Sequence, residues 1–325
     1  MKSKGFVIHQ HGGSDVLQWQ DVDLPELGAN DVLVRHTAIG INFIDIYFRQ
    51  GLYPMTLPGR LGIEAAGVVE AVGSGVSQFS AGDRVAYCKG GLGSYAEAHI
   101  VAENCLIPVP DDIDDETAAA VLLKGLTAAY LLYKTAPLQA GANILIQAAA
   151  GGVGTLLSQW AKHLGAYVIG TVGSEEKAVL AKANGCDETI LYDQQDVAEE
   201  VRRLTGGKGV EVVFDSVGAA TCEASLNSLA KRGLFVSFGN ASGPVEAIAP
   251  LTLLQKGSVF MTRPGLADYI EDRAEMLELS GLLFAAIREG HVKVSINQRY
   301  GLKDAAKAQD DLAQRLTTGS SILLP

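Results

Sequence analysis

Two kinds of hydrophobic pattern divide the chain near residue 115. Before that point, short segments alternate apolar and polar residues and end in glycine-rich turns, which predicts strands at 6–8, 17–22, 31–40, 64–72 and 83–87. Strands of this length and spacing are typical of an antiparallel, barrel-like domain. After that point, apolar runs alternate with segments of helical spacing, which predicts an α/β fold with a parallel, doubly wound sheet.

The second pattern can be resolved into individual elements. Predicted helices lie at 114–123, 126–133, 155–164, 177–184, 197–205 and 222–229. Predicted strands lie at 144–146, 167–172, 188–192, 210–215, 233–238 and 258–261. The last part, with helices at 270–290 and 302–316 and strands at 292–300 and 321–324, is predicted to return to the first domain. We therefore expect one domain inserted between two parts of another, with a functional cleft between them.

The small-residue turn at 148–154, between a predicted strand and a predicted helix, is the most informative segment. A glycine turn in this context binds a dinucleotide, because the pyrophosphate meets the free N–H groups of the helix N-terminus. The candidate cofactor-binding residues are Gly151, Gly152, Val153 and Gly154. Ala149 replaces the first glycine of the usual fingerprint, so an ordinary strand–helix turn is the alternative.

The end of the next strand indicates which dinucleotide is bound. An NAD site usually has an Asp or Glu there for the ribose 2′-hydroxyl, whereas this chain has Gly173 and Ser174, followed by Lys177. A small residue, a hydroxyl and an ammonium favour a 2′-phosphate. Glu175 and Glu176 can point to solvent from the first turn of the following helix. We predict NADP(H), with a solvated surface lysine as the alternative for Lys177.

Charge and cysteine content exclude several classes of protein. The formal net charge is −11 and the sequence contains no run of basic residues, so nucleic-acid binding has little electrostatic support. No apolar segment approaches about 18 residues, and no signal peptide or membrane span is expected. The four cysteines stand far apart, which suits a reducing compartment and predicts a cytoplasmic protein.

Further motifs accompany the glycine turn. They are Gly40-Ile-Asn-Phe-Ile-Asp-Ile-Tyr47, Gly51-Leu-Tyr-Pro54, Gly62-Ile-Glu-Ala-Ala-Gly-Val68, Ala81-Gly-Asp-Arg-Val85, Leu123-Lys-Gly-Leu-Thr127, Asp215-Ser-Val-Gly218, Val236-Ser-Phe-Gly-Asn240 and Thr262-Arg-Pro264. With them the chain resembles, over nearly its whole length, the zinc-free quinone oxidoreductases of the medium-chain dehydrogenase/reductase superfamily. The resemblance implies a GroES-like catalytic domain at 1–125 and 266–325, a Rossmann NADPH-binding domain at 126–265, and reduction of quinones.

The resemblance also predicts a site without metal. Zinc-dependent alcohol dehydrogenases of the same superfamily hold zinc with two cysteines and a histidine. Here Asn42 and Ile63 stand at two of these positions, no cysteine lies near Lys124, and an isoleucine cannot bind zinc. Without a Lewis acid an alcohol is hard to deprotonate, so we expect an electron-poor acceptor such as a quinone. The oxygen that becomes negative then needs hydrogen bonds and a proton.

Asn42, Asp45 and Tyr47 are the predicted catalytic residues, because the resemblance places their segment beside the nicotinamide. The Asn42 amide and the Tyr47 hydroxyl can donate to an acceptor oxygen or to the carboxamide, and Tyr47 is the candidate proton donor. A structural hydrogen-bonding role is the alternative for all three and the preferred interpretation for Asp45. Tyr53, with Tyr47, is a candidate substrate contact, and turn packing is its alternative.

The remaining cofactor candidates follow from the resemblance and from the rule that ligands meet the carboxyl ends of parallel strands. They are Asn42, Tyr130, Tyr192, Ser216, Phe238, Gly239, Asn240, Arg263 and Pro264. Tyr192 is expected beside the adenine or the 2′-phosphate. For Tyr130, a buried helix tyrosine is the alternative.

Other functions stay open at this point. An NADPH-dependent reductase of conjugated enals or enones would use the same hydride geometry, with protonation at carbon. A binding or structural protein is a different class, since the resemblance includes lens crystallins and RNA binders, although the acidic charge disfavours RNA. A zinc alcohol dehydrogenase is disfavoured by the missing ligands. The apolar strand at 258–261 is expected at a sheet edge that must be covered, which predicts a homodimer.

Overall fold

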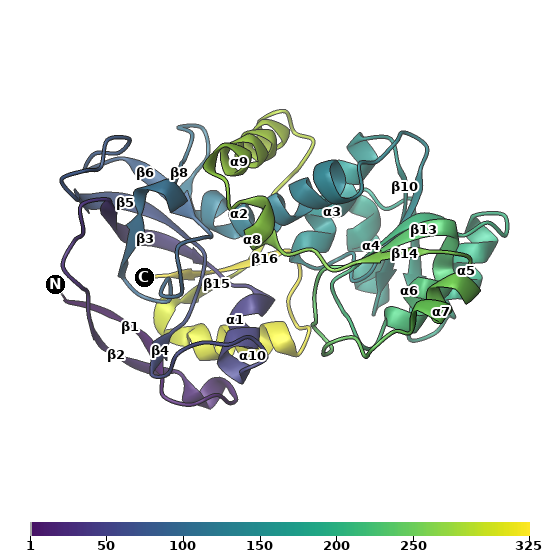
Figure 1. The fold of residues 1–325 in the computed structure, drawn as a ribbon, viewed down its shortest axis with the longest axis horizontal. Coiled ribbons are helices and arrows are strands. Elements are labelled where there is room, and N and C mark those ends of the chain that lie inside the picture. Colours follow the sequence, from purple (N-terminus) through teal and green to yellow (C-terminus); the bar gives the residue numbers. More distant parts are fainter. Residues whose placement is uncertain (1) are drawn as a thin grey trace. The chain divides into compact units, whose positions relative to one another are not determined.

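The computed structural model describes residues 2–325, which form two compact units (Figure 1). Unit 1 comprises residues 2–124, 272–284 and 294–325, and unit 2 comprises residues 125–271 and 285–293. The domain limits expected from the sequence, at 125/126 and 265/266, stay a prediction. No helix within the described residues is both long and apolar enough to cross a membrane.

Unit 2 is built on a six-stranded sheet in which all neighbouring strands are parallel. Its strands, in spatial order, are β11 (Glu188–Leu191), β10 (Tyr167–Val172), β9 (Asn143–Ile146), β12 (Val210–Asp215), β13 (Leu229–Ser237) and β14 (Phe260–Thr262). This order is that of the doubly wound Rossmann sheet, whose ligands bind where the order reverses, here beyond the carboxyl ends of β9 and β12. The predicted α/β fold is confirmed.

Helices link these strands and complete the core. They are α3 (Gly152–His163), α4 (Glu175–Ala183), α5 (Val197–Leu204), α6 (Cys222–Ser228) and α7 (Pro250–Gln255). The core residues Leu145, Ile169, Val213 and Phe235 come from the central strands and are fully buried. A parallel sheet is covered on both faces, which explains why its strands read as continuous apolar runs in the sequence.

The glycine turn after β9 packs tightly against β10, and this contact explains how Ala149 is accommodated. A Cβ atom placed on Gly170 of β10 would lie 2.6 Å from the Cβ of Ala149 and 2.7 Å from the Sγ of Cys186. Real Cβ atoms do not approach so closely. Gly170 has no side chain and therefore leaves room for the methyl group of Ala149, which a glycine at position 149 would not need.

Unit 1 contains two sheets. The larger, mostly antiparallel sheet has the order β15 (Ile296–Gly301), β16 (Ser320–Leu324), β3 (Asp31–Gly40), β5 (Ala65–Val72), β6 (Arg84–Tyr87) and β8 (Ile107–Pro108), with β7 (Ala98–Ala102) also paired to β3. The smaller one has the order β2 (Gln18–Asp23), β1 (Lys2–Ile8) and β4 (Gly59–Arg60). Val32, Val34 and Ile39 of β3 are buried in the core, as strand alternation predicts. The expected antiparallel domain is confirmed.

The other helices are α1 (Phe43–Gln50), α2 (Asp115–Tyr130), α8 (Leu266–Tyr269), α9 (Arg273–Arg288) and α10 (Ala305–Ala313), with a π-helical segment η3 (Leu131–Thr135) after α2. The prediction of two helices at 114–123 and 126–133 is wrong, because α2 runs continuously through Lys124 and Gly125. A helical glycine costs about 1 kcal/mol, and the burial of nearly every residue from 118 to 130 outweighs this cost. The predicted helix at 270–290 corresponds to the single helix α9, and the short helix α8 before it was not predicted.

We predict that Gly170→Ala lowers the free energy of unfolding by about 1–3 kcal/mol, because the new methyl group overpacks Ala149 and Cys186. Adding Ala149→Gly should recover part of this loss, because it removes one of the two clashes. Urea denaturation of the single and double variants measures both effects. Gly281→Ala in α9, which meets no atom within 4 Å, is the control and should not destabilise. A Gly170→Ala protein as stable as the unchanged chain would contradict the prediction.

Candidate active site

The predicted pyrophosphate-binding turn has the geometry that a dinucleotide requires. The Gly151 N–H donates to the Ala148 carbonyl at 3.0 Å, and Gly151 is the N-cap of α3. A Cβ on Gly154 would press on the Ala148 carbonyl oxygen and lie 2.8 Å from the Cα of Ala149, so only glycine lets α3 pack on its strand. No side chain caps the N-terminus of α3, so its first N–H groups can meet a pyrophosphate at the end of β9.

The residues predicted to select a 2′-phosphate come from two adjacent strand ends. The Tyr192 N–H donates to the Val172 carbonyl at 3.2 Å, and a Cβ on Gly173 would collide with the Tyr192 hydroxyl. Ser174 caps α4 by accepting from the Lys177 N–H at 3.3 Å. Gly173, Ser174, Lys177 and Tyr192 are therefore neighbours, as the sequence suggested.

Glu176 is exposed, as expected for a residue on the first turn of α4. Its interaction with the Ser174 side chain lowers the pKa of Glu176. A phosphate at this position would compete with Glu176 for the Ser174 side chain.

The loops after β12 and β13 meet at the other predicted cofactor positions. A Cβ on Gly239 would lie 2.9 Å from the Ser216 carbonyl carbon, the Phe238 N–H donates to the Asp215 carbonyl at 2.8 Å, and the Asn240 carbonyl accepts from Gly243 at 3.0 Å. Arg263 and Pro264 follow β14, and the Arg263 Nη1 donates to the Pro264 carbonyl at 2.7 Å.

Asp215 organises these loops and was not singled out as a site residue. It is fully buried, and its carboxylate accepts from the Val217 and Gly218 N–H groups and from the Thr221 and Ser225 hydroxyls. Four donors on one carboxylate fix the turn that carries Ser216. A carboxylate at the end of an apolar strand, followed by Ser, Val and Gly, was the available signal.

Tyr130 ends α2 and is buried. Its ring stacks on that of Tyr269, with centroids 4.3 Å apart and planes inclined by 13°. The packing agrees with the structural alternative given for it above, and a role in phosphate binding stays a prediction.

In unit 1, Asn42 is held by a buried carboxylate. The Asn42 Nδ2 donates to Glu64 Oε2 at 2.8 Å, and the Leu123 N–H donates to Glu64 Oε1 at 2.5 Å. Lys124 Nζ lies 3.7 Å from the same Oε2. Burial raises the pKa of Glu64, and the Lys124 ammonium and the Asn42 amide act against that rise. Neither Glu64 nor Lys124 was predicted as a site residue; the signal was a lone charge within an apolar segment.

Asp45 lies in the first turn of α1 and caps its N-terminus. Its Oδ2 accepts from the Asn42 N–H at 2.9 Å and from the Tyr95 hydroxyl at 3.0 Å. Burial raises the pKa of Asp45 to about 7. These contacts fit the structural interpretation preferred for Asp45, since it caps a helix and orients the residue before that helix.

Tyr47 lies on the second turn of α1 and is nearly buried. Its ring makes an edge contact with Tyr53, at a centroid distance of 5.3 Å, and Tyr53 also contacts Phe48. The Tyr53 N–H donates to the Tyr47 carbonyl at 3.2 Å. The two tyrosines predicted to contact the substrate are therefore neighbours.

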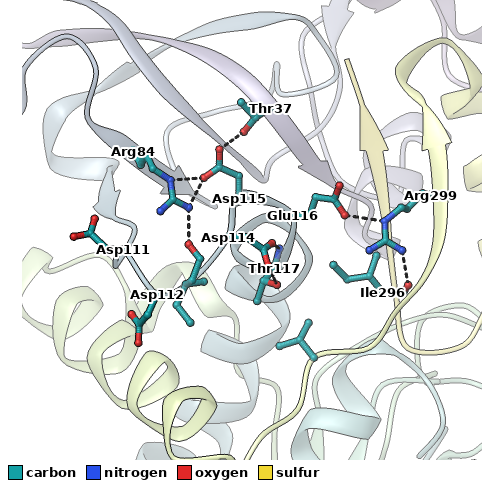
Figure 2. Close-up of a pocket in the computed structure, with 12 residues that line it drawn as sticks. Thr37, Arg84, Asp111, Asp112, Asp114, Asp115, Glu116, Thr117, Ile296 and Arg299 are labelled. Carbon is teal, nitrogen blue, oxygen red and sulfur yellow. Dashed lines mark hydrogen bonds and ion pairs between the residues drawn. The ribbon is translucent and has the colours of Figure 1, made fainter.

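A polar hollow lies elsewhere in unit 1, over the start of α2 (Figure 2). None of the predicted site residues lines it. Arg84 pairs with Asp115 at 2.6 Å and Arg299 pairs with Glu116 at 2.7 Å. These ion pairs of the hollow connect β6 and β15 to α2. Among residues 2–325, no group of three or more His, Cys, Asp and Glu is arranged to hold a metal ion.

The raised pKa of Asp45 predicts how stability depends on pH. Between about pH 4 and pH 7 the native state binds the Asp45 proton and the unfolded state does not, so stability falls as pH rises. From pH 5 to pH 8 this loss amounts to about 2–3 kcal/mol. Asp45→Asn keeps an acceptor for Asn42 and Tyr95 and carries no charge, so it should remove the loss and be more stable than the unchanged chain at pH 8.

Urea denaturation at pH 5, 6, 7 and 8 measures this effect. Asp83→Asn, at an exposed aspartate that accepts from the Ser80 N–H, is the matched control and should keep the original pH trend. The same trend in Asp45→Asn and in the unchanged chain would refute the assignment.

Comparisons with known proteins agree with this architecture and extend it. Residues 28–111 match the family described as alcohol dehydrogenase GroES-like domain, and residues 152–280 match the zinc-binding dehydrogenase family. The quinone oxidoreductase of Pseudomonas aeruginosa is 52% identical over 99% of this chain and 100% of that protein. The 2-haloacrylate reductase of a Burkholderia species is 44% identical over 98% of each chain.

A solved structure is equally similar. The crystal structure of Escherichia coli quinone oxidoreductase complexed with NADPH has a TM-score of 0.97 and 47% identity, covering 99% of this chain and 100% of that chain. At such identity over the full length, the chain belongs to the quinone oxidoreductases of the medium-chain, zinc-binding dehydrogenase superfamily.

Proposed function

We propose that this chain is an NADPH-dependent oxidoreductase that reduces quinones. The observation that carries the proposal is the full-length identity to quinone oxidoreductases, one of which was solved with NADPH, combined with a dinucleotide turn of the required geometry. Bound NADPH supplies the hydride, and the protein supplies binding, orientation and hydrogen bonds.

The residues of unit 2 fit NADPH. The backbone around Gly151 and Gly154 leaves room for a pyrophosphate at the start of α3, and no side chain fills that space at Gly151. At the end of β10 stand Gly173 and Ser174 instead of the carboxylate that would hold a ribose 2′-hydroxyl. Lys177, one turn into α4, gives the 2′-phosphate a cationic partner.

In unit 1 we assign Asn42 and Tyr47 to the reacting end of the cofactor. One N–H of the Asn42 amide binds Glu64, and its second N–H can donate to the carboxamide or to the quinone oxygen. Tyr47 is assigned as the proton donor, with Tyr53 as a wall of the quinone site. Asp45 acts through Asn42, whose backbone N–H it accepts.

A second activity is supported by one specific observation. The Burkholderia relative, which is 44% identical to this chain, is a 2-haloacrylate reductase, so similar proteins of this superfamily act on different classes of acceptor. Reduction of a conjugated carbonyl at carbon is therefore the alternative. It uses the same hydride donor with a proton delivered to carbon.

We further propose a homodimer and a cytoplasmic location. Strand β14 ends the sheet of unit 2 (Figure 1). Its residue Phe260 is 61% exposed. Leu251 and Leu254 of α7, the helix that leads into β14, are also exposed. An apolar sheet edge needs a cover, and a second copy of the chain provides one. Four free thiols suit the cytoplasm.

The central experiment measures NADPH oxidation with 1,4-benzoquinone, 9,10-phenanthrenequinone, a conjugated enone and a simple ketone. We expect turnover with the quinones and none with the ketone. Turnover confined to the enone would favour the alternative, and no turnover with any acceptor would leave only cofactor binding.

The same assay tests the cofactor assignment. Lys177→Ala should raise the KM for NADPH about tenfold and leave the KM for NADH nearly unchanged, because only NADPH carries the 2′-phosphate. Lys182→Ala is the matched control, since Lys182 lies on the same helix and pairs with Glu188. An equal effect of Lys177→Ala on both cofactors would refute the role of Lys177.

The dimer is tested by analytical ultracentrifugation at micromolar concentration. We expect a dimer for the unchanged chain and a monomer for Phe260→Lys, which places a charge on the β14 edge. Val179→Lys serves as control, because Val179 is 71% exposed on α4. A monomeric unchanged chain would contradict the proposal.

A further inference from the structure

Lys124 is a charged residue in the interior of α2, and its side chain is almost completely buried, with 6% of its surface exposed. A buried ammonium is costly unless acceptors satisfy its three N–H donors. Its carboxylate partner, Glu64 Oε2, is 3.7 Å away, which is longer than a hydrogen bond. Within residues 2–325, Lys124 Nζ makes no hydrogen bond.

Glu64 does not need Lys124 as a hydrogen-bond donor. Its Oε2 already accepts from Asn42 and its Oε1 from Leu123. The carboxylate is confined further because a Cβ on Gly40 would overlap it. Glu64 therefore holds the ammonium by charge and leaves its N–H groups available to another acceptor.

The available donors lie beside the proposed reaction site. Lys124 Nζ and Asn42 Nδ2 both approach the same oxygen, Glu64 Oε2, so the ammonium and the amide are close neighbours. Both side chains are nearly but not fully buried. An acceptor oxygen that binds the second N–H of Asn42 is thus within reach of a positive charge.

We infer that the Lys124 ammonium is a further catalytic group, which binds the substrate oxygen that becomes negative on hydride transfer. The inference rests on the proposed quinone reduction. In the balanced step the quinone gains one hydride, which leaves NADP⁺ behind, and becomes a hydroquinone monoanion that takes one proton from Tyr47 or water. Lys124 keeps its own proton throughout and supplies charge-assisted hydrogen bonds.

The first test compares Lys124→Met with the double variant Glu64→Gln/Lys124→Met. Lys124→Met leaves Glu64 buried without its counter-ion and can destabilise the fold. The double variant contains no buried charge at this place, and Glu64→Gln alone is its reference, because both proteins change the acceptor that holds Asn42. We expect the double variant to bind NADPH as Glu64→Gln does, measured by cofactor fluorescence, with a kcat for 1,4-benzoquinone about 100-fold lower than that of Glu64→Gln. Lys182→Met, at an exposed lysine, should match the unchanged chain.

The double variant separates the two roles that Lys124 could have. If Lys124 served only to neutralise Glu64, its removal from Glu64→Gln would not lower turnover. Turnover of the double variant equal to that of Glu64→Gln therefore overturns the inference. Lys124→Arg keeps the positive charge and should retain more activity than the double variant.

A spectroscopic measurement tests the inference without catalysis. 4-Nitrophenol carries one ionisable ring oxygen, like the hydroquinone monoanion, and its phenolate absorbs visible light. With NADP⁺ present, the unchanged chain and Lys124→Arg should bind the phenolate about tenfold more tightly than the phenol, and the double variant should lose this preference. An equal preference in all three proteins overturns the inference. If the chain selects the phenolate through Lys124 but reduces no quinone, the proposed function is refuted and the role of Lys124 in binding a negative oxygen is not.

Discussion

The buried Glu64 carboxylate is the group on which the polar part of unit 1 depends. A carboxylate without exposed surface is stable only when donors or an opposite charge compensate it. Here Asn42, before α1, and the backbone of Leu123 donate hydrogen bonds, and the Lys124 ammonium in α2 supplies the opposite charge. Each donor that satisfies Glu64 is fixed by it in return. Gly40, whose missing side chain leaves room for the carboxylate, completes the arrangement. The positions of α1 and α2 and the orientation of Asn42 thus follow from one desolvated charge.

The sheets could be predicted from the sequence because their signals are local. Apolar runs such as 144–146 and 210–215, separated by helical periodicity, are sufficient for a parallel sheet, and the turn at 148–154 identifies its ligand-binding end. The continuity of α2 could not be predicted in this way. Lys124 and Gly125 are poor signals for a helix interior, and only burial against the rest of the protein overrides them. Helix α1 was missed for a related reason, since Asn42 and Asp45 were interpreted as chemistry while they also form its cap.

The candidate site shows the same limit at the level of side chains. Gly173, Ser174, Lys177 and Tyr192 could be grouped in advance because the carboxyl ends of neighbouring parallel strands meet. Glu64 and Lys124 lie 60 positions apart, and no periodicity connects them. The interaction of Ser174 with Glu176, which lowers the pKa of Glu176, is equally invisible in the sequence. Long-range polar contacts therefore need the structure, although a single charge within an apolar segment marks where to look.

In the proposed site, the cofactor part is formed by backbone and the acceptor part by side chains. This difference accounts for one family that acts on more than one class of acceptor. The cofactor end uses backbone geometry, with Gly154 and Gly170 making room that a single methyl group would fill. Such a turn tolerates little change. The acceptor end uses side chains, with Asn42 and Lys124 anchored on Glu64 and Tyr47 packed against Tyr53. These groups can stabilise the charge on an acceptor oxygen whether the hydride enters a quinone or a conjugated carbonyl. We therefore expect the shape formed by Tyr47 and Tyr53, more than the polar network, to distinguish the two acceptor classes.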